Sequence, residues 1–489
     1  MDPFRKKKMK RRYLRIPAEL KQAIKIPEAE IKLEQVKKLK RRIITNFNQG
    51  ELRHVYTVLR FLRENQAEKP NLLAKSLCDI AESIFDKNTK QEFFEEALEL
   101  NPYDSITLTS YAIFLADNNQ SDRALKLFEQ SLSVDGYNSV TLTSYAIALA
   151  DNNQPEKAFE LFEKSLSIEG NETVTLTSYA TALASYNQPD KAFELFEQSL
   201  NISMDDTVTL TSYATALANY NQPDEAFELF ERSLSLKRGD TITLTSYATA
   251  LANDNQPDKA FELFEQSLSI KPYETVTLNS YANAQANYNQ PDKAFELFEK
   301  SLTMKPDKIV TLNSYATTLA NYNYPEKAFE LFEKSLCVKG NDTVTLNSYA
   351  QALANHNQPK KAFELFEKSL NISGDNTVTL TSYATALANY NQPQKAFELF
   401  EQSLSIKGDE TVTLNSYSIA LAKYNYPKLA LEKITESLNI APDKPVTLFI
   451  YDNMLESVGS NKYKRAISNL KKWFIQLYQN ISLTLSRLF

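Results

Sequence analysis

The sequence predicts an all-α protein, a right-handed α-solenoid of stacked helix-turn-helix hairpins. The first observation behind this prediction is a Ser-Tyr pair that recurs every 34 residues without insertion, with its tyrosine at 111, 145, 179, 213, 247, 281, 315, 349, 383 and 417. A fixed period of this length is typical of repeat proteins, whose stacked units bury apolar faces that one unit cannot bury alone. The second is a shortage of glycine, with 8 Gly beside 18 Pro, 26 Tyr and 27 Phe in 489 residues. So few glycines argue against dinucleotide-binding and phosphate-loop folds.

The first half of each unit is predicted to be a helix, helix A. We number the places within a unit from 1 to 34 and call them positions; ten complete units, repeats one to ten, begin at residues 105, 139, 173, 207, 241, 275, 309, 343, 377 and 411. Positions 4, 7, 8 and 11 are apolar and fall on one side of a helix at 100° per residue. The β-branched run Thr173–Thr177 alone resembles a strand. The 34-residue period overrides that local signal.

The second half of each unit is predicted to be a second helix, helix B. Positions 15 to 17 usually read Asn-Gln-Pro, as at Asn187-Gln188-Pro189. Asn tolerates the left-handed conformation that ends a helix, and Pro fits the first turn of the next one. Positions 20, 21, 23, 24, 27, 28 and 30 then form one stripe, and Gly or Pro often follows at position 32. Each unit is therefore expected to fold as a hairpin.

The same register divides the chain into four parts. Residues 105–444 are the ten tandem repeats, and residues 28–104 are expected to form a helical N-terminal cap with a degenerate repeat. Residues 445–489 are expected to form a further degenerate repeat and a capping helix with an apolar stripe that includes Ile467, Leu470 and Phe474. Residues 1–27 are a basic N-terminal tail.

The repeats resemble the tetratricopeptide family. Beside the period, the resemblance rests on a small residue at position 8, Ala at position 20, Phe at position 24 in nine repeats and a small residue at position 27. The repeats depart from the family pattern with Leu at position 4 and Asn at position 15. The resemblance implies a superhelix whose concave groove is lined by helix A, at positions 2, 5, 9, 12 and 13, and which binds partner peptides.

Asparagines are the candidate binding residues of this groove, because an amide both donates to and accepts from a peptide backbone. Two sets stand at groove positions: Asn219, Asn253, Asn287, Asn321, Asn355 and Asn389 at position 13, and Asn279, Asn313, Asn347 and Asn415 at position 5. An alternative interpretation makes the position-13 residues passive helix caps. The tyrosines at position 14, such as Tyr186 and Tyr220, are expected to pack over the turn, with an aromatic ridge for a partner as the alternative.

The sequence gives no support for an enzyme, a cofactor or a metal site. Its only histidines, His54 and His356, have no cysteine at metal-ligand spacing, and His356 is expected at an exposed helix end. The paired Glu residues at positions 22 and 25 are interpreted as a solvated surface. Arg238-Gly239-Asp240 spells an adhesion tripeptide, which we attribute to chance. Cys78 and Cys337 lie far apart in sequence, and no apolar segment is long enough for a membrane span, so we expect a cytoplasmic protein.

Charge is distributed unevenly. Residues 1–46 hold 16 Lys/Arg and 5 Asp/Glu, residues 461–489 hold 6 Lys/Arg and no acid, and residues 47–460 hold 33 Lys/Arg and 56 Asp/Glu, a net charge of −23. A basic patch stands at Lys6, Lys7, Lys8, Lys10, Arg11 and Arg12. It is either a solvated tail or a contact for nucleic acid, an anionic membrane or an acidic partner.

Three functions remain in view. We expect a non-enzymatic protein-interaction scaffold or adaptor that binds a partner polypeptide in the helix A groove. One alternative is single-stranded RNA binding by a pentatricopeptide-like solenoid, which some repeat segments also resemble, although the acidic body opposes it. The other is a regulatory subunit of an enzyme complex. The sequence leaves the oligomeric state open.

Overall fold

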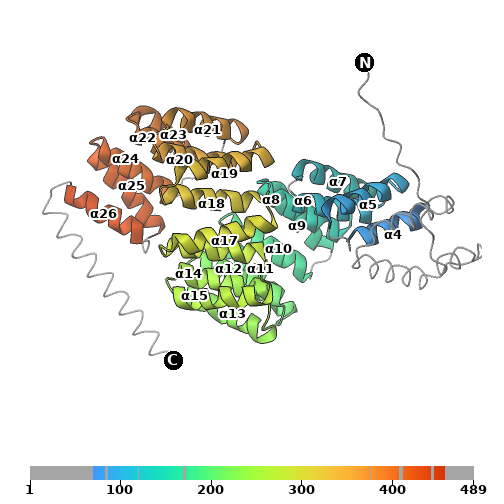
Figure 1. Ribbon diagram of the computed structural model, residues 1–489. Coiled ribbons are helices and arrows are strands. Elements are labelled where there is room, and N and C mark those ends of the chain that lie inside the picture. The colour runs from blue at the N-terminus through green and yellow to red at the C-terminus, as the bar shows by residue number, and fades with distance from the viewer. Residues whose placement is uncertain are drawn as a thin grey trace, which may run out of the picture. The chain divides into compact units, whose positions relative to one another are not determined.

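The computed structural model describes residues 70–82, 86–118, 120–168, 172–374, 376–406, 411–441 and 445–457. Every regular element in these ranges is an α-helix, from α4 to α26 (Figure 1). The predicted all-α solenoid of helix-turn-helix hairpins is confirmed. The basic tail, the whole segment 28–69 with His54, and the predicted C-terminal capping helix lie outside the described residues. Among the helices that are described, none has the length and apolar content needed to cross a bilayer.

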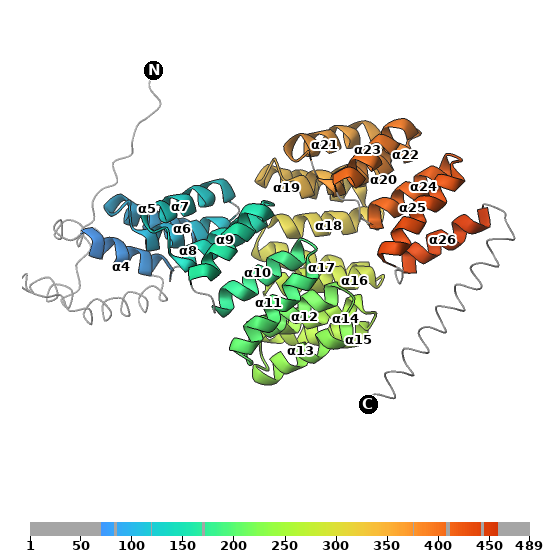
Figure 2. The same cartoon turned by 180° about the vertical axis from the view of Figure 1, so that it is seen from behind.

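Each repeat contributes one A helix of 13 residues and one B helix of 14 residues. The A helices are α6 Ser105–Asp117, α8 Ser139–Asp151, α10 Thr173–Ser185, α12 Thr207–Asn219, α14 Thr241–Asn253, α16 Thr275–Asn287, α18 Ile309–Asn321, α20 Thr343–Asn355, α22 Thr377–Asn389 and α24 Thr411–Lys423. The B helices are α7 Ser121–Val134, α9 Pro155–Ile168, α11 Pro189–Ile202, α13 Pro223–Leu236, α15 Pro257–Ile270, α17 Pro291–Met304, α19 Pro325–Val338, α21 Pro359–Ile372, α23 Pro393–Ile406 and α25 Pro427–Ile440. The pair α4 Pro70–Glu82 and α5 Lys87–Leu100 precedes them, and α26 Pro445–Ser457 follows beside α24 and α25 (Figure 2).

Local chemistry fixes both ends of helix A. At its start, a carboxylate or amide at position 34 of the preceding unit caps the helix in several repeats; Asp206 accepts a hydrogen bond of 3.1 Å from the backbone N–H of Thr209. At its end, the asparagine at position 15 takes the left-handed conformation in nine repeats, with φ between 56° and 66°. This is the role predicted for Asn187. Proline then opens helix B, where its missing N–H costs nothing.

The chain forms two compact units, Met1–Leu236 and Lys237–Phe489. Within each unit the core is a column of fully buried Ala at position 20 and Phe at position 24, such as Ala192 and Phe196 in the first unit and Ala328 and Phe332 in the second. The small Ala lets the A and B helices approach closely, and the Phe fills the space between hairpins. Each such ring buries enough apolar surface to contribute about 2 to 3 kcal/mol. In the second unit one buried cluster runs from Ala282 to Met454, whereas the described part of the first unit has two, Leu77–Ala148 and Ala146–Ala216.

Aromatic side chains join consecutive repeats. The ring of Tyr179, at position 7, stacks on Phe162 of the preceding repeat with centroids 5.1 Å apart and an interplanar angle of 15°. Its hydroxyl donates to Glu163, at position 25 of that repeat, over 3.2 Å. The same bond recurs in both units, so the position-25 carboxylates are partners of the next repeat and not only a solvated surface. That part of the sequence interpretation is corrected.

A second contact between repeats comes from the tyrosines at position 14. The hydroxyl of Tyr220 donates to the backbone carbonyl of Ala184, near the end of the preceding A helix, over 2.6 Å. Its ring meets Phe193 edge-on at 6.0 Å. His356 occupies this position in repeat eight, with Nε2 2.9 Å from the Ala320 carbonyl oxygen, and is half-buried where an exposed residue was expected. These side chains therefore pack between repeats.

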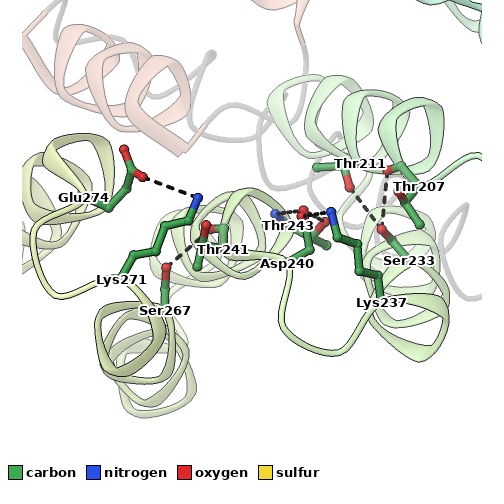
Figure 3. A network of polar contacts seen from close by, with 10 residues as sticks. All are labelled: Thr207, Thr211, Ser233, Lys237, Asp240, Thr241, Thr243, Ser267, Lys271 and Glu274. Carbon is green, nitrogen blue, oxygen red and sulfur yellow. Dashed lines mark hydrogen bonds and ion pairs between the residues drawn. The ribbon is translucent and has the colours of Figure 1, made fainter. Parts of the chain in front are cut away.

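A buried ladder of hydroxyls runs through the interior of each unit. In repeat two, Thr143 Oγ1, at position 5, lies 2.9 Å from Ser165 Oγ of its own B helix and 2.8 Å from Thr175 Oγ1 of the next A helix. Figure 3 shows further members, with Ser267 donating to the Thr241 carbonyl in the second unit. Among the described residues, no buried hydroxyl of this ladder is left without a partner, as buried polar groups require.

Candidate functional site

The exposed stripe of helix A is the candidate functional site. Positions 2, 6, 9 and 13 are three or four residues apart and therefore lie on one side of the helix. The opposite side, at positions 4, 8 and 11, is packed in the core. We call the exposed stripe the A-face. Within each unit the A helices of consecutive repeats pack directly, for example α8 against α10 and α16 against α18, so their stripes lie next to one another.

Position 2 places one exposed aliphatic side chain on the A-face of every repeat. It is always Val or Ile, and its exposed fraction runs from 53% at Ile106 to 68% at Ile242. A single exposed Val needs no explanation, because most protein surfaces contain some. An exposed Val or Ile at the same position of every repeat is unusual. Continuous exposed apolar surface marks binding sites.

Position 13 places an amide at the other end of the A-face in six successive repeats. The side chains of Asn219, Asn253, Asn287, Asn321, Asn355 and Asn389 are all exposed. Within the described residues only Asn389 has a hydrogen-bond partner, Lys423 Nζ at 3.4 Å. The end of helix A is formed by the residue at position 14 and the left-handed asparagine at position 15, as at Asp254 and Asn255. Capping therefore does not use the position-13 side chains.

The asparagines at position 5 lie elsewhere, in the interior. Asn279 and Asn313 are 6% and 8% exposed, and their Nδ2 atoms donate over 2.7 Å to Thr311 and Thr345 of the next repeat. Asn347 is half-buried, and its Oδ1 is enclosed. These side chains replace the Thr of the hydroxyl ladder. Their burial removes them from the surface that a partner can reach.

Position 9 varies along the chain. In repeats one and two it is Ile113 and Ile147, which are 37% and 38% exposed. In repeats three to five it is Thr181, Thr215 and Thr249, whose hydroxyls donate over 2.8 Å to the carbonyl four residues earlier. Asn283 and Gln351 follow in later repeats. The A-face is thus more apolar in repeats one and two than in repeats three to nine.

The A-face also carries little charge. Positions 2, 6, 9 and 13 hold no Lys or Arg in repeats one to nine. The acidic residues among them are Asp117 and Asp151, at position 13 of repeats one and two. Burial raises the pKa of Asp117, and burial together with repulsion from Asp117 raises the pKa of Asp151. This surface therefore offers no cationic clamp for a carboxylate.

Among the described residues, no group of three His, Cys, Asp or Glu side chains could hold a metal ion. Asp240 of the Arg-Gly-Asp triplet is bound as the cap of α14, accepting from Thr243 N–H at 3.1 Å and pairing with Lys237 at 2.7 Å (Figure 3). The sequence-predicted basic patch Lys6–Arg12 lies outside the described residues.

Comparison with known families gives three matches. A model described as "Tetratricopeptide repeat" matches residues 33–204, "PPR repeat" matches residues 344–371, and "Sel1 repeat" matches residues 287–304 and 322–337. No curated protein matches the chain.

Two solved structures are similar in fold. The crystal structure of the yeast Tom70 is 14% identical, with a TM-score of 0.46, over 82% of this chain and 100% of the other. The crystal structure of the APC/C hetero-tetramer Cut9-Hcn1 is 12% identical, with a TM-score of 0.41, over 86% of this chain and 96% of the other.

The observations within the chain agree with the first family match. The period is 34 residues, each period folds as one hairpin, and small residues at positions 8, 20 and 27 stand where helices meet. The match begins ahead of repeat one and extends into repeat three. The repeats of this chain are thus similar to those of the tetratricopeptide-repeat family, whose model matches residues 33–204.

Proposed function

We propose that the chain is a non-enzymatic scaffold that binds a partner polypeptide along the A-face of its second unit. The observation that carries the proposal is the row of exposed position-13 amides. Asn253, Asn287, Asn321 and Asn355 are exposed at the ends of their A helices and make no hydrogen bond to any described residue. Each amide can donate to and accept from the backbone of an extended peptide.

The spacing of the repeats defines how a partner meets this row. Helices that pack directly lie about 8 to 10 Å apart. An extended chain rises about 3.3 Å per residue, so one repeat corresponds to about three residues of the partner. The position-2 side chains, such as Val276 and Val310, add an apolar contact in each repeat. We therefore expect a partner that binds in an extended conformation and lacks a requirement for a terminal carboxylate.

A triple variant tests this assignment. Replacing Asn253, Asn287 and Asn321 by Ala removes three amides without touching the core, so it is expected to weaken partner binding at least tenfold. The matched control replaces Asn279 and Asn313 by Thr, the residue that six other repeats place at position 5. This double control is buried and is expected to leave binding unchanged.

The measurement is affinity capture from native lysate with all three proteins, followed by quantitative mass spectrometry. The partner is expected to be retained by the wild type and the control and lost with the triple variant. Equal recovery by all three would place the binding surface away from the position-13 amides. If the captured partner is an enzyme, the scaffold is a regulatory subunit of its complex, which is one of the alternatives named above.

RNA binding is a second candidate, because residues 344–371 match the "PPR repeat" model. Phosphate binding needs positive charge, and the A-face of repeats one to nine has no Lys or Arg. Fluorescence anisotropy with a labelled single-stranded RNA, across a range of salt concentrations, separates the two functions. We expect no saturable binding to residues 47–460, and any binding of the full chain to fall steeply with salt.

A further inference from the structure

The A-face of repeats one and two differs from that of repeats three to nine in its apolar content. Ile113 and Ile147 are more than one third exposed at position 9, where the next three repeats have Thr. The position-2 residues of the same repeats, Ile106 and Val140, are 53% and 57% exposed. These four side chains thus lie on a single solvent-facing surface of α6 and α8. No described side chain covers it.

This apolar surface is bordered by two carboxylates. Asp117 and Asp151 follow Ile113 and Ile147 by four residues, so they lie on the same side of their helices. Neither carboxylate has a hydrogen-bond or ion-pair partner among the described residues. Burial raises the pKa of Asp117, and electrostatic attraction from Lys90 offsets part of that rise. The ammonium group of Lys90, however, lies over the Phe114 ring and donates to the Glu82 carbonyl. Asp151 has repulsion from Asp117 and no compensating cation.

A segment of the same chain has the complementary chemistry. Residues 1–27 contain 10 Lys/Arg and 2 Asp/Glu, and within them Arg12-Tyr13-Leu14-Arg15-Ile16 interleaves cations with apolar side chains. Tyr13 and Ile16 are three residues apart, which is one turn and about 9 Å in a polyproline II conformation, so in that conformation both side chains can face one surface at about the spacing of two packed A helices. We propose that the N-terminal segment Lys10–Ile16 binds the A-face of repeats one and two, with apolar side chains on Ile113 and Ile147 and cations near Asp117 and Asp151.

The chain is long enough for this contact. Between Ile16 and Pro70, where the described residues begin, lie 53 residues, a contour length of at most about 180 Å. The described hairpin that precedes repeat one, α4–α5, adds about 20 Å of packed helices. Attachment to the same chain raises the effective concentration of the segment, so a weak contact is sufficient.

The consequence is that repeats one and two are occupied by the chain itself. A foreign partner for this surface must be both cationic and apolar, and it must displace the N-terminal segment. The inference concerns different repeats and a different occupant from the partner binding proposed for the second unit. Either one can fail without the other.

Zero-length cross-linking of the full-length protein tests the inference. A carbodiimide joins a lysine amine to a carboxylate only when the two are in contact, and mass spectrometry identifies the joined peptides. We expect links from Lys8 or Lys10 to Asp117 or Asp151. Mixing isotope-labelled and unlabelled protein distinguishes links within one chain from links between copies.

The variant Ile113→Thr/Ile147→Thr separates docking from general charge attraction. It keeps both carboxylates and installs the residue that repeats three to five already use at position 9, so the fold is retained, which circular dichroism checks. The yield of the Lys–Asp links is expected to fall about tenfold. The matched control Ile242→Thr, on the A-face of repeat five, is expected to leave the yield unchanged.

Three results would overturn the inference. The first is an unchanged yield of Lys–Asp links in the Ile113→Thr/Ile147→Thr variant, because charge attraction alone would then explain the links. The second is a yield of links to exposed carboxylates of the B helices, such as Glu160, that equals the yield of links to Asp117 and Asp151. The third is a majority of links between labelled and unlabelled copies, which assigns the surface to a contact between two molecules.

Discussion

Replacement of Asn279 by Thr is expected to stabilise the protein, because this asparagine leaves part of its amide unpaired inside the second unit. In repeat five, Thr245 Oγ1 lies 3.2 Å from Ser267 Oγ and 2.8 Å from Thr277 Oγ1, so its hydroxyl is fully used. In repeat six, Asn279 Nδ2 donates to Thr311 Oγ1 over 2.7 Å, but Oδ1 is buried with no partner among the described residues. Thr at this place restores the pattern of the neighbouring repeat.

The magnitude follows from the unpaired acceptor. A buried carbonyl oxygen without a hydrogen bond costs about 1 to 3 kcal/mol. Asn and Thr have similar helix propensities, so the backbone contributes little to the difference. Thr is one heavy atom smaller than Asn, and the small space it leaves offsets part of the gain. We therefore expect the free energy of unfolding to rise by about 1 kcal/mol.

The assay is urea unfolding followed by circular dichroism, together with amide hydrogen exchange in α16 and α18. Repeat arrays can unfold in parts, so exchange locates the change that the unfolding midpoint reports as a whole. The reverse replacement, Thr245→Asn, is the matched control and is expected to lower the midpoint. A lower midpoint for Asn279→Thr would show that Oδ1 makes a contact that outweighs the hydroxyl bonds. An unchanged midpoint for Thr245→Asn would contradict the role of the ladder.

Three further perturbations concern contacts in the first unit. Tyr220→Phe removes the bond to the Ala184 carbonyl but keeps the ring contact, and is expected to lower the free energy of unfolding by about 0.5 to 1.5 kcal/mol in urea titrations. Asn187→Ala places an alanine at φ 60° and is expected to cost about 1 kcal/mol by the same measurement, whereas Asn187→Gly is expected to be nearly neutral. Burial, and next the Glu197 carboxylate, raises the pKa of Tyr213 from 10.0 to about 12. The stabilising contribution of the Tyr213 phenol is complete below pH 10 and is lost between pH 10 and about 12. Ultraviolet titration is therefore expected to find this tyrosine ionising only above pH 10. Ionisation of Tyr213 near pH 10 in the folded protein would contradict the raised pKa.

The hairpins could be predicted from the sequence because their signals are local and repeated. The 34-residue period sets the number of hairpins, and the Asn-Gln-Pro triplet sets the turn between helices A and B. Asn187 is left-handed and Pro189 opens α11, as their side-chain and backbone chemistry requires. Because the same pattern occurs ten times, the period also shows that Thr173–Thr177 belongs to a helix, although its local sequence resembles a strand. For such elements, propensity and periodicity are sufficient.

The placement of position 5 could not be predicted in the same way. A helical wheel treats helix A as having one buried side, toward its own helix B. In the stack, helix A also packs against the A helix of the next repeat, so its buried arc is wider and includes Asn279 and Asn313. The bond from Tyr179 to Glu163 likewise spans two hairpins, and its 16-residue spacing matches no local period. Contacts between repeats depend on how hairpins pack, which the sequence pattern does not encode directly.

The differences among repeats indicate where function can reside. Positions that hold repeats together, such as the buried Ala, Phe and Ser of helix B, are nearly the same in all ten, because each copy must fit two neighbours of the same shape. Positions 9 and 13 of the A-face are free of this constraint, and there the repeats diverge. Position 13 passes from Asp117 through Ser185 and the asparagines to Lys423. A change of side chain at these two positions leaves the stack intact, so on the proposed partner surface the identities at positions 9 and 13 are what distinguish one stretch of the A-face from another.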